Sequence, residues 1–310
     1  MTKNNSMREA FGCGLARAAE NDERVVALVA DLTNSVGFGE FAKKFPERLV
    51  QVGIAEQNLV TVASGMAHVG KIPFAAGYAV FSPGRNWEQI RTTICLNDVP
   101  VKLVSTHAGV NVGPDGASHQ ALEDIALMRV LPNMVVIAPG DATEAEQVAI
   151  AMAHDNRPNY VRLPRADSPV IFNKSYKFEI GKAYPLRKGR DVTLLGTGTM
   201  TAQLLAAAEM LSRKIDCEVI HVPTIKPLDV ETILKSVKKT RRVVTCEEHQ
   251  VASGFGSTIA ELLSENMPVP LKRIGINDEF GQSGTPDELL DYYGLTVKHI
   301  ANVAKDFMRK

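Results

Sequence analysis

The sequence predicts an α/β protein of two doubly wound domains, and three observations lead to that prediction. Short runs rich in Val and Ile alternate with longer helical stretches along the 310 residues. The alternation breaks once, in a polar stretch over 166–190 that contains Pro and Gly, and then resumes. The composition, 45% hydrophobic and 23% charged, is that of a globular protein. Strands that alternate with helices predict mostly parallel sheets with helices on both faces.

The first domain is predicted to occupy residues 1–170. Helical patterns follow two of its strands, at 56–68 and 142–153, and the second begins with Asp141 as a cap and Glu144 as the cap's partner. The strands are the short apolar runs at 25–30, 49–52, 101–105, 134–138 and 160–163.

A linker is predicted over 171–190, and a smaller α/β domain over 191–310. Its last predicted helix begins near Thr285, because Pro286 suits the first helical position. The strands expected in this domain are 191–198, 217–222, 241–248 and 271–276, and the other helices are 200–212, 229–238 and 255–265.

Charge and cysteine content exclude several classes of protein. Lys plus Arg and Asp plus Glu number 35 each, so bulk electrostatics predicts neither a nucleic-acid nor a membrane partner. The four cysteines lie far apart without a C-x-x-C pair, which argues against a zinc site or a disulfide framework. The first residues lack the apolar stretch of a signal peptide, and no apolar run reaches the length of a membrane span. A cytoplasmic location is therefore expected.

Polar residues follow the expected strands of the first domain. The carboxyl ends of parallel strands share one edge of a sheet, where ligands bind in open α/β folds. Each residue alone has an ordinary structural explanation, such as a helix-start acid, a turn cap or a surface ion pair. Together they predict a binding or catalytic site. In chain order they are Asp31, Thr33, Asn34, Ser35, Glu56, Gln57, Thr106, His107, Asp115, His119 and Arg165.

The second domain carries weaker signals. GTGTM (196–200) is not a dinucleotide fingerprint, because the third glycine of G-x-G-x-x-G is missing. EEHQVASGFGS (247–257) contains His249, which we interpret as structural.

Four segments of the chain resemble transketolase, and they agree with it jointly in order and spacing. The resemblance is to the C-terminal half of that enzyme, its pyrimidine-binding domain followed by its C-terminal domain, and it covers nearly all 310 residues. The segments are VADLTNS (29–35), GIAEQN (53–58), GYAVFSPGRNWEQIR (77–91) and STHAGVNVGPDGASHQALEDIALMRVLPNM (105–134). The resemblance implies transfer of a two-carbon ketol unit between phosphosugars, as in the pentose phosphate pathway.

The resemblance also implies thiamine diphosphate as the cofactor. Glu56 matches the family's glutamate, which contacts the pyrimidine ring of the cofactor, and apolar neighbours would help its carboxyl group share a proton there. Tyr78 and Phe81 match the two aromatic positions beside that ring, although the first is usually Phe in the family. Asp31 and Leu32 match residues near the cofactor.

Substrate contacts follow from the same resemblance. Asp115 matches a residue that recognises a substrate hydroxyl, and His119 matches one beside the reacting carbons, where an imidazole can donate a proton or move one. Pro114 departs from the family, which often has Glu there. The residues that match the phosphate-binding positions are Arg8, Ser35, His107 and Arg165, whose donors suit a phosphate group.

The family's diphosphate- and magnesium-binding motif, GDG followed by Asn, has no convincing match here. GPDG (113–116) belongs to the histidine segment, and GDAT (140–143) has Ala142 where Gly is required. We therefore expect no metal ligands in this chain. A separate N-terminal transketolase subunit is expected to supply the Mg²⁺ ligands and the diphosphate site, in a heterotetramer with two copies of each chain.

Two alternatives remain at this point. In the first, the chain is a subunit of another thiamine enzyme, which is either deoxyxylulose-phosphate synthase-like or a 2-oxoacid dehydrogenase beta subunit. In the second, it is a non-catalytic relative that binds a phosphosugar. The matched phosphate set favours a phosphosugar substrate over a 2-oxoacid. The presence of both Glu56 and His119 argues against a pure binding protein.

Overall fold

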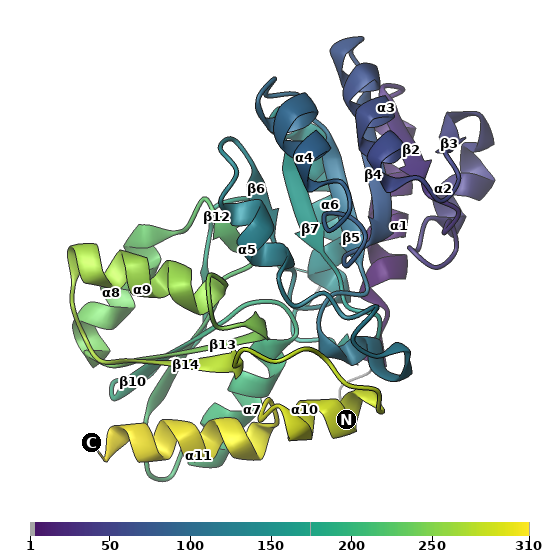
Figure 1. Cartoon of the computed structure of the whole chain (residues 1–310). Helices are drawn as coiled ribbons and strands as arrows, with labels where there is room; N and C mark the ends of the chain where they lie inside the picture. The colour runs from purple at the N-terminus through teal and green to yellow at the C-terminus, as the bar shows by residue number, and fades with distance from the viewer. Residues whose placement is uncertain (1–3, 174, 310) are drawn as a thin grey trace.

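The computed structural model describes residues 4–173 and 175–309, which form two α/β domains packed against each other (Figure 1). The first domain is built on a seven-stranded sheet in the order β12-β6-β7-β5-β4-β2-β3. Every neighbouring pair is parallel except β12 with β6, which confirms a mostly parallel sheet. The strands are β2 (Val25–Val29), β3 (Leu49–Gln51), β4 (Ile72–Tyr78), β5 (Lys102–Thr106), β6 (Val135–Ile137), β7 (Asn159–Arg162) and β12 (Thr224–Lys226).

Helices cover both faces of this sheet, as predicted. Alternate residues of β2 show why: Val26 and Leu28 pack with α3 on one face, whereas Val25 and Val29 pack with α1 and α6 on the other. Figure 1 shows α3 and α1 on opposite sides of the strands. The helices are α1 (Met7–Asn21), α2 (Gly39–Lys44), α3 (Glu56–His68), α4 (Trp87–Gln89), α5 (Asp124–Arg129) and α6 (Ala142–His154), with shorter or irregular turns η1 (Pro46–Arg48), η2 (Ile90–Cys95) and η3 (Val110–Asp115).

Strand β4 is an element that sequence analysis did not predict. It lies between β2 and β5 in the middle of the sheet. Its sequence, IPFAAGY, contains a proline, a glycine and two alanines, which lack the β-branched side chains typical of strands. The small residues are nevertheless buried, because helices cover both faces of this strand.

The second domain has a five-stranded sheet in the order β14-β13-β10-β11-β9. β9 (Tyr184–Arg187), which falls within 171–190, pairs antiparallel with β11, and the other pairs are parallel. Among the described residues, no helix has the length and apolar character needed to cross a membrane. The other elements are β10 (Val192–Gly196), α7 (Met200–Leu211), β11 (Cys217–His221), α8 (Val230–Thr240), β13 (Val243–Gln250), α9 (Phe255–Asn266), β14 (Leu271–Ile276), α10 (Pro286–Tyr292) and α11 (Val297–Met308).

Strand β12 and the cap of α6 are among the contacts that join the domains. Strand β12 belongs to the second domain in sequence but pairs with β6 in the first sheet. The predicted cap of α6 is confirmed, since Asp141 accepts from Glu144 N at 2.9 Å and Glu144 accepts from Gly140 N at 2.6 Å. The same Glu144 carboxylate lies 2.7 Å from Nε2 of His221, a fully buried residue at the end of β11. A helix cap of one domain therefore also binds the other domain.

Candidate active site

At the carboxyl edge of the first sheet, two residues of the candidate site lie at sharp turns of the backbone. Asp31 follows β2 and His107 follows β5, and both have left-handed backbone conformations with φ of 61° and 60°. Such conformations are uncommon outside glycine and cluster at functional sites. The Asp31 N–H is held by the Gln51 side chain at 3.0 Å. Leu32 packs in the same apolar cluster as Tyr78, beneath this edge.

Glu56 is the first residue of α3, and its side chain is only 5% exposed. A charged side chain lies beside its carboxyl group, in addition to the apolar neighbours expected from the sequence. Arg85, from the loop after β4, approaches both carboxylate oxygens at 3.1 and 3.3 Å, and its guanidinium lies 4.1 Å from the centre of the Phe81 ring. Asn86 Nδ2 donates to the Glu56 backbone carbonyl at 2.9 Å. Burying the carboxylate without this cation would be unfavourable.

An open hollow of about 550 Å³ lies at this end of the site, lined by residues 54–58 and Arg85. The Glu56 carboxylate therefore faces a space on the surface of the chain. Beside it, Tyr78 and Phe81 lie nearly parallel, with ring centroids 6.1 Å apart and an angle of 22°. A buried carboxyl group that is linked through Arg85 to two aromatic rings suits a flat ligand ring with a nitrogen that can share a proton with it.

The aromatic pair connects Glu56 to a histidine cluster. The His107 ring stacks on Tyr78 at 3.8 Å, and the His119 ring meets Phe81 edge-on at 5.4 Å. His119 Nδ1 lies 2.9 Å from the Ser118 hydroxyl. Asp115 is exposed at the end of η3. The structure thus places His119 near the aromatic faces and Asp115 at the rim.

A cationic group gathers at the other end of the site. Arg8 of α1 donates to the Ser35 carbonyl at 2.6 Å and to the Arg165 carbonyl at 3.1 Å. Arg165 in turn donates from Nη1 to the Val112 carbonyl at 2.6 Å. Burial, together with the nearby charges of Arg8 and Arg165, lowers the pKa of His107 to about 3. His107 is therefore neutral at physiological pH, beside two guanidinium groups.

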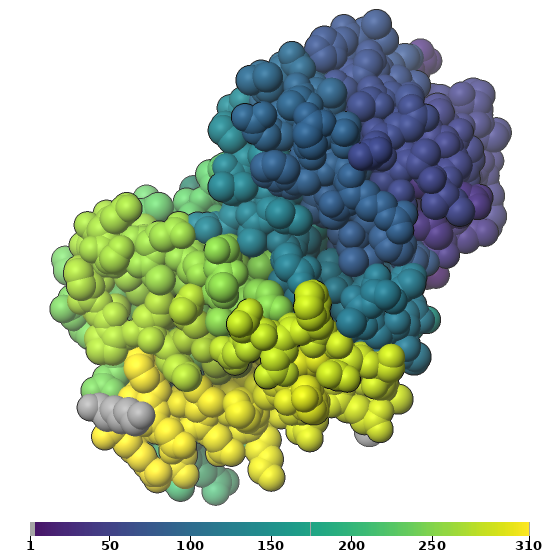
Figure 2. All heavy atoms as spheres, in the orientation of Figure 1, coloured from purple at the N-terminus to yellow at the C-terminus, as the bar shows by residue number. Residues whose placement is uncertain are grey.

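The segment that carries Asp115 and His119 is packed against the second domain. Gln120 Nε2 donates to the Gln282 carbonyl at 2.9 Å. Gly113 (φ 80°) and Gly116 (φ 71°) leave room for the chain around residues 283–286, where a Cβ atom on either would meet neighbours. Figure 2 shows the yellow-green surface near residue 280 lying directly against the blue surface of this segment.

The predicted site residues fall into two connected groups. Glu56 lines the hollow with Arg85, which lies over the Phe81 ring. The cationic group lies beyond Tyr78 and is linked to the second domain through Asn111. Among the described residues, no cluster of three or more His, Cys, Asp or Glu side chains is arranged to hold a metal ion. The structure brings together at the cationic end Arg8, Ser35, His107 and Arg165.

Sequence reasoning missed three residues that shape the site. Arg85 has a local signal, a cation four positions after Phe81 in the same loop. Asn111 and Glu248 have none, because they meet across 137 residues of sequence: Glu248 accepts from Asn111 N at 2.7 Å and from its Nδ2 at 3.0 Å. Only the fold brings such residues together.

Comparison with known proteins gives consistent matches. Residues 3–170 match the pyrimidine binding domain of transketolase, and residues 181–300 match the transketolase C-terminal domain. A transketolase C-terminal section from Methanocaldococcus jannaschii is 44% identical over 308 residues, which cover 98% of this chain and 96% of that protein. A 6-deoxy-6-sulfo-D-fructose transketolase subunit from Clostridium sp. (strain MSTE9) is 39% identical over 302 residues, covering 97% of this chain and 94% of that protein. The structure of a split gene transketolase, an inactive β4 tetramer, matches with a TM-score of 0.92 and 44% identity over 98% of both chains.

Proposed function

The chain belongs to the transketolase family, and from that premise we propose how its residues serve a thiamine diphosphate-dependent transfer of two-carbon ketol units between phosphosugars. It corresponds to the C-terminal half of transketolase, the part that binds the cofactor's pyrimidine ring. The observation that carries the proposal is the continuous site from Glu56 through the aromatic pair to the cationic group.

The residues around the hollow fit the pyrimidine ring of thiamine diphosphate. The ring would lie against Tyr78 and Phe81, with a ring nitrogen at the Glu56 carboxylate. When bound, the cofactor supplies the nucleophilic ring carbon that this carbonyl chemistry requires. Glu56 holds a proton at the ring nitrogen, and Arg85 moves away from the carboxylate to admit the ring. Because Arg85 is 52% exposed, it can change position without repacking the core.

The sugar substrate would extend from the aromatic faces to the cationic end. Arg8 and Arg165 provide the charge that attracts a terminal phosphate, and Ser35 and His107 provide further polar contacts. Neutral His107 offers one N–H donor without adding a third positive charge. His119 donates to the oxygen that gains negative charge at the reacting carbons, and Asp115 accepts from a substrate hydroxyl.

A second polypeptide is proposed to complete the site. It would bring the diphosphate-binding domain and the Mg²⁺ ligands to the hollow at Glu56, in a heterotetramer with two copies of each chain. Two findings on relatives support this: one is a C-terminal section and another is a subunit. The β4 tetramer of the split gene transketolase is inactive, which supports a requirement for a partner.

The direct test is titration of thiamine diphosphate with Mg²⁺ into the chain, alone and with the product of a neighbouring reading frame that carries the GDG and Asn motif. We expect tight binding and ketol transfer from xylulose 5-phosphate only in the mixture. Full activity of the chain alone would refute the two-subunit proposal. Pyruvate decarboxylation in place of ketol transfer would instead assign the mixture to another class of thiamine enzyme.

A further inference from the structure

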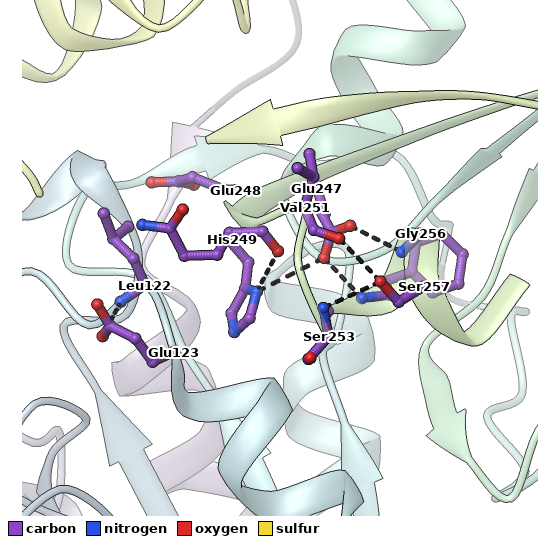
Figure 3. Close-up of polar contacts among 12 residues, drawn as sticks. Leu122, Glu123, Glu247, Glu248, His249, Val251, Ser253, Gly256 and Ser257 are labelled. Carbon is purple, nitrogen blue, oxygen red and sulfur yellow. Dashed lines mark hydrogen bonds and ion pairs between the residues drawn. The ribbon is translucent and has the colours of Figure 1, made fainter. Parts of the chain in front are cut away.

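Glu248 lies on β13 in the second domain, yet its carboxylate faces the first. Successive side chains of a strand point to opposite faces. Accordingly, Glu247 points to the start of α9, where it accepts from the N–H groups of Phe255 and Gly256 at 2.6 and 2.7 Å. Figure 3 shows Glu248 directed away from this contact. Its side chain is buried, with 4% of the residue exposed.

Three donors converge on the Glu248 carboxylate. Oε1 accepts from the backbone N–H of Asn111 at 2.7 Å, and Oε2 accepts from Asn111 Nδ2 at 3.0 Å and from the Thr199 hydroxyl at 3.0 Å. Gly109 has φ of 89°, and a Cβ atom there would overlap the carboxylate. The backbone of the first domain is therefore shaped to admit this acid.

Asn111 passes the contact on to Arg165. Because its amide nitrogen faces the Glu248 carboxylate, its oxygen is free to accept from the backbone N–H of Arg165 at 3.0 Å. The next residue, Val112, accepts from the Arg165 guanidinium at 2.6 Å. Glu248 thus holds, through one asparagine, both the backbone of Arg165 and the carbonyl that orients its side chain.

We propose that Glu248 is a positioning residue through which the second domain fixes Arg165 for the terminal phosphate of the sugar. This rests on the proposed function, in which Arg165 contacts that phosphate. Arg162 supports the arrangement from below, because it donates to the Glu248 carbonyl at 3.3 Å and forms a two-point ion pair with Asp124 at 2.7 and 3.1 Å. The second domain then has a definite task in substrate binding, although it contributes no residue to the phosphate contact itself.

The test measures binding of ribose 5-phosphate to the full chain by calorimetry, with ribose as the probe that lacks phosphate. Glu248→Gln keeps the shape of the side chain but replaces one acceptor oxygen by a donor. We expect its Kd for ribose 5-phosphate to rise about tenfold, as for the loss of one hydrogen bond to a charged group. Glu247→Gln is the matched control on the opposite face of the same strand, and its Kd should stay within about twofold.

A double-mutant cycle separates positioning from general destabilisation. If Glu248 acts through Asn111, then Asn111→Ala raises the Kd by a similar factor, and the added Glu248→Gln change has little further effect. Independent, additive effects would overturn the proposal, as would equal Kd shifts in Glu247→Gln and Glu248→Gln. If Glu248→Gln does not fold, Asn111→Ala decides, since an unchanged Kd in that variant also overturns the proposal.

Arg165→Ala distinguishes this inference from the function on which it rests. If wild-type chain binds ribose 5-phosphate and Arg165→Ala loses that binding, the phosphate site stands and the Glu248 variants test the positioning role alone. If Arg165→Ala binds as the wild type does, or the wild type does not bind, the phosphate site itself is refuted and the positioning role falls with it.

Discussion

The two ends of the candidate site differ in how completely this chain builds them. At the Glu56 end, a buried carboxylate faces an open hollow, and its ion-pair partner is the half-exposed Arg85. At the Arg165 end, backbone and guanidinium groups are already hydrogen-bonded, and the contacts extend into the second domain. We infer from this difference that the cationic end is preorganised within one chain, and we propose that the Glu56 end is completed by a partner.

The largest expected effect concerns the unfinished end. Glu56→Gln should reduce ketol transfer by the reconstituted enzyme by at least about 100-fold, because an amide cannot hold the shared proton at the pyrimidine ring. Steady-state kinetics with xylulose 5-phosphate measures this. Glu40→Gln, an exposed acid in the first turn of α2, is the matched control and should retain activity. Undiminished activity of Glu56→Gln would remove Glu56 from the catalytic residues.

A smaller effect is expected at the preorganised end. Arg8→Lys keeps the positive charge, but an ammonium group cannot reproduce the two-armed contact with the carbonyls of Ser35 and Arg165. KM for the sugar phosphate should rise about tenfold with a smaller change in kcat, since phosphate binding is largely uniform between ground and transition state. A fall in kcat at constant KM would place Arg8 at the reacting carbons instead.

The ion pair between Arg85 and Glu56 tests how much the Glu56 end of the site contributes to stability. Arg85→Met keeps an aliphatic contact with Phe81 but leaves the Glu56 carboxylate without its cation. The free energy of unfolding should fall by only about 1 kcal/mol, because half-exposed ion pairs contribute little. Urea denaturation of the chain alone gives this value. A loss several times larger would mean that the hollow is as rigidly built as the cationic end.

The pH dependence of stability gives an effect that is smallest at neutral pH and grows only in acid. The His107 pKa of about 3 in the folded chain is below the ordinary value of 6.5, so the unfolded chain binds this proton more readily. The contribution of His107 to stability is therefore complete above pH 6.5 and falls as the pH decreases toward 3. His107→Gln should reduce the slope of the unfolding free energy against pH, in the range from 6.5 to 3, by the contribution of one proton. Titration of the His107 ring between pH 5 and 8, followed by NMR, would contradict a neutral imidazole between two arginines.

Local patterns predicted most of the fold but only part of the site. Short apolar runs predicted the strands that are rich in Val and Ile, because β-branched residues pack well in buried strands. Strand β4 was not predicted. Helices on both faces bury its alanines, and these alanines form no pattern that a short stretch of sequence reveals. Strand β12 was not predicted either, because it is only three residues long and its partner β6 lies far away in sequence.

The candidate site shows the same limit at the level of side chains. Residues at strand ends, such as Glu56 and His107, could be predicted from position in the alternating pattern and from the family resemblance. The charge that meets Glu56 comes from another loop, and the acid that holds Asn111 comes from another domain. Long-range pairing of this kind depends on the packed fold, and one sequence carries no local record of it.

The pairing of β12 with the first sheet has a consequence for how this molecule folds. Without β12, strand β6 would become an exposed edge of the first sheet, a surface on which other chains can add strands and aggregate. The second domain therefore supplies the last strand of the first sheet as well as packing beside it. Because the two domains share this sheet, heating should unfold them in one cooperative calorimetric transition.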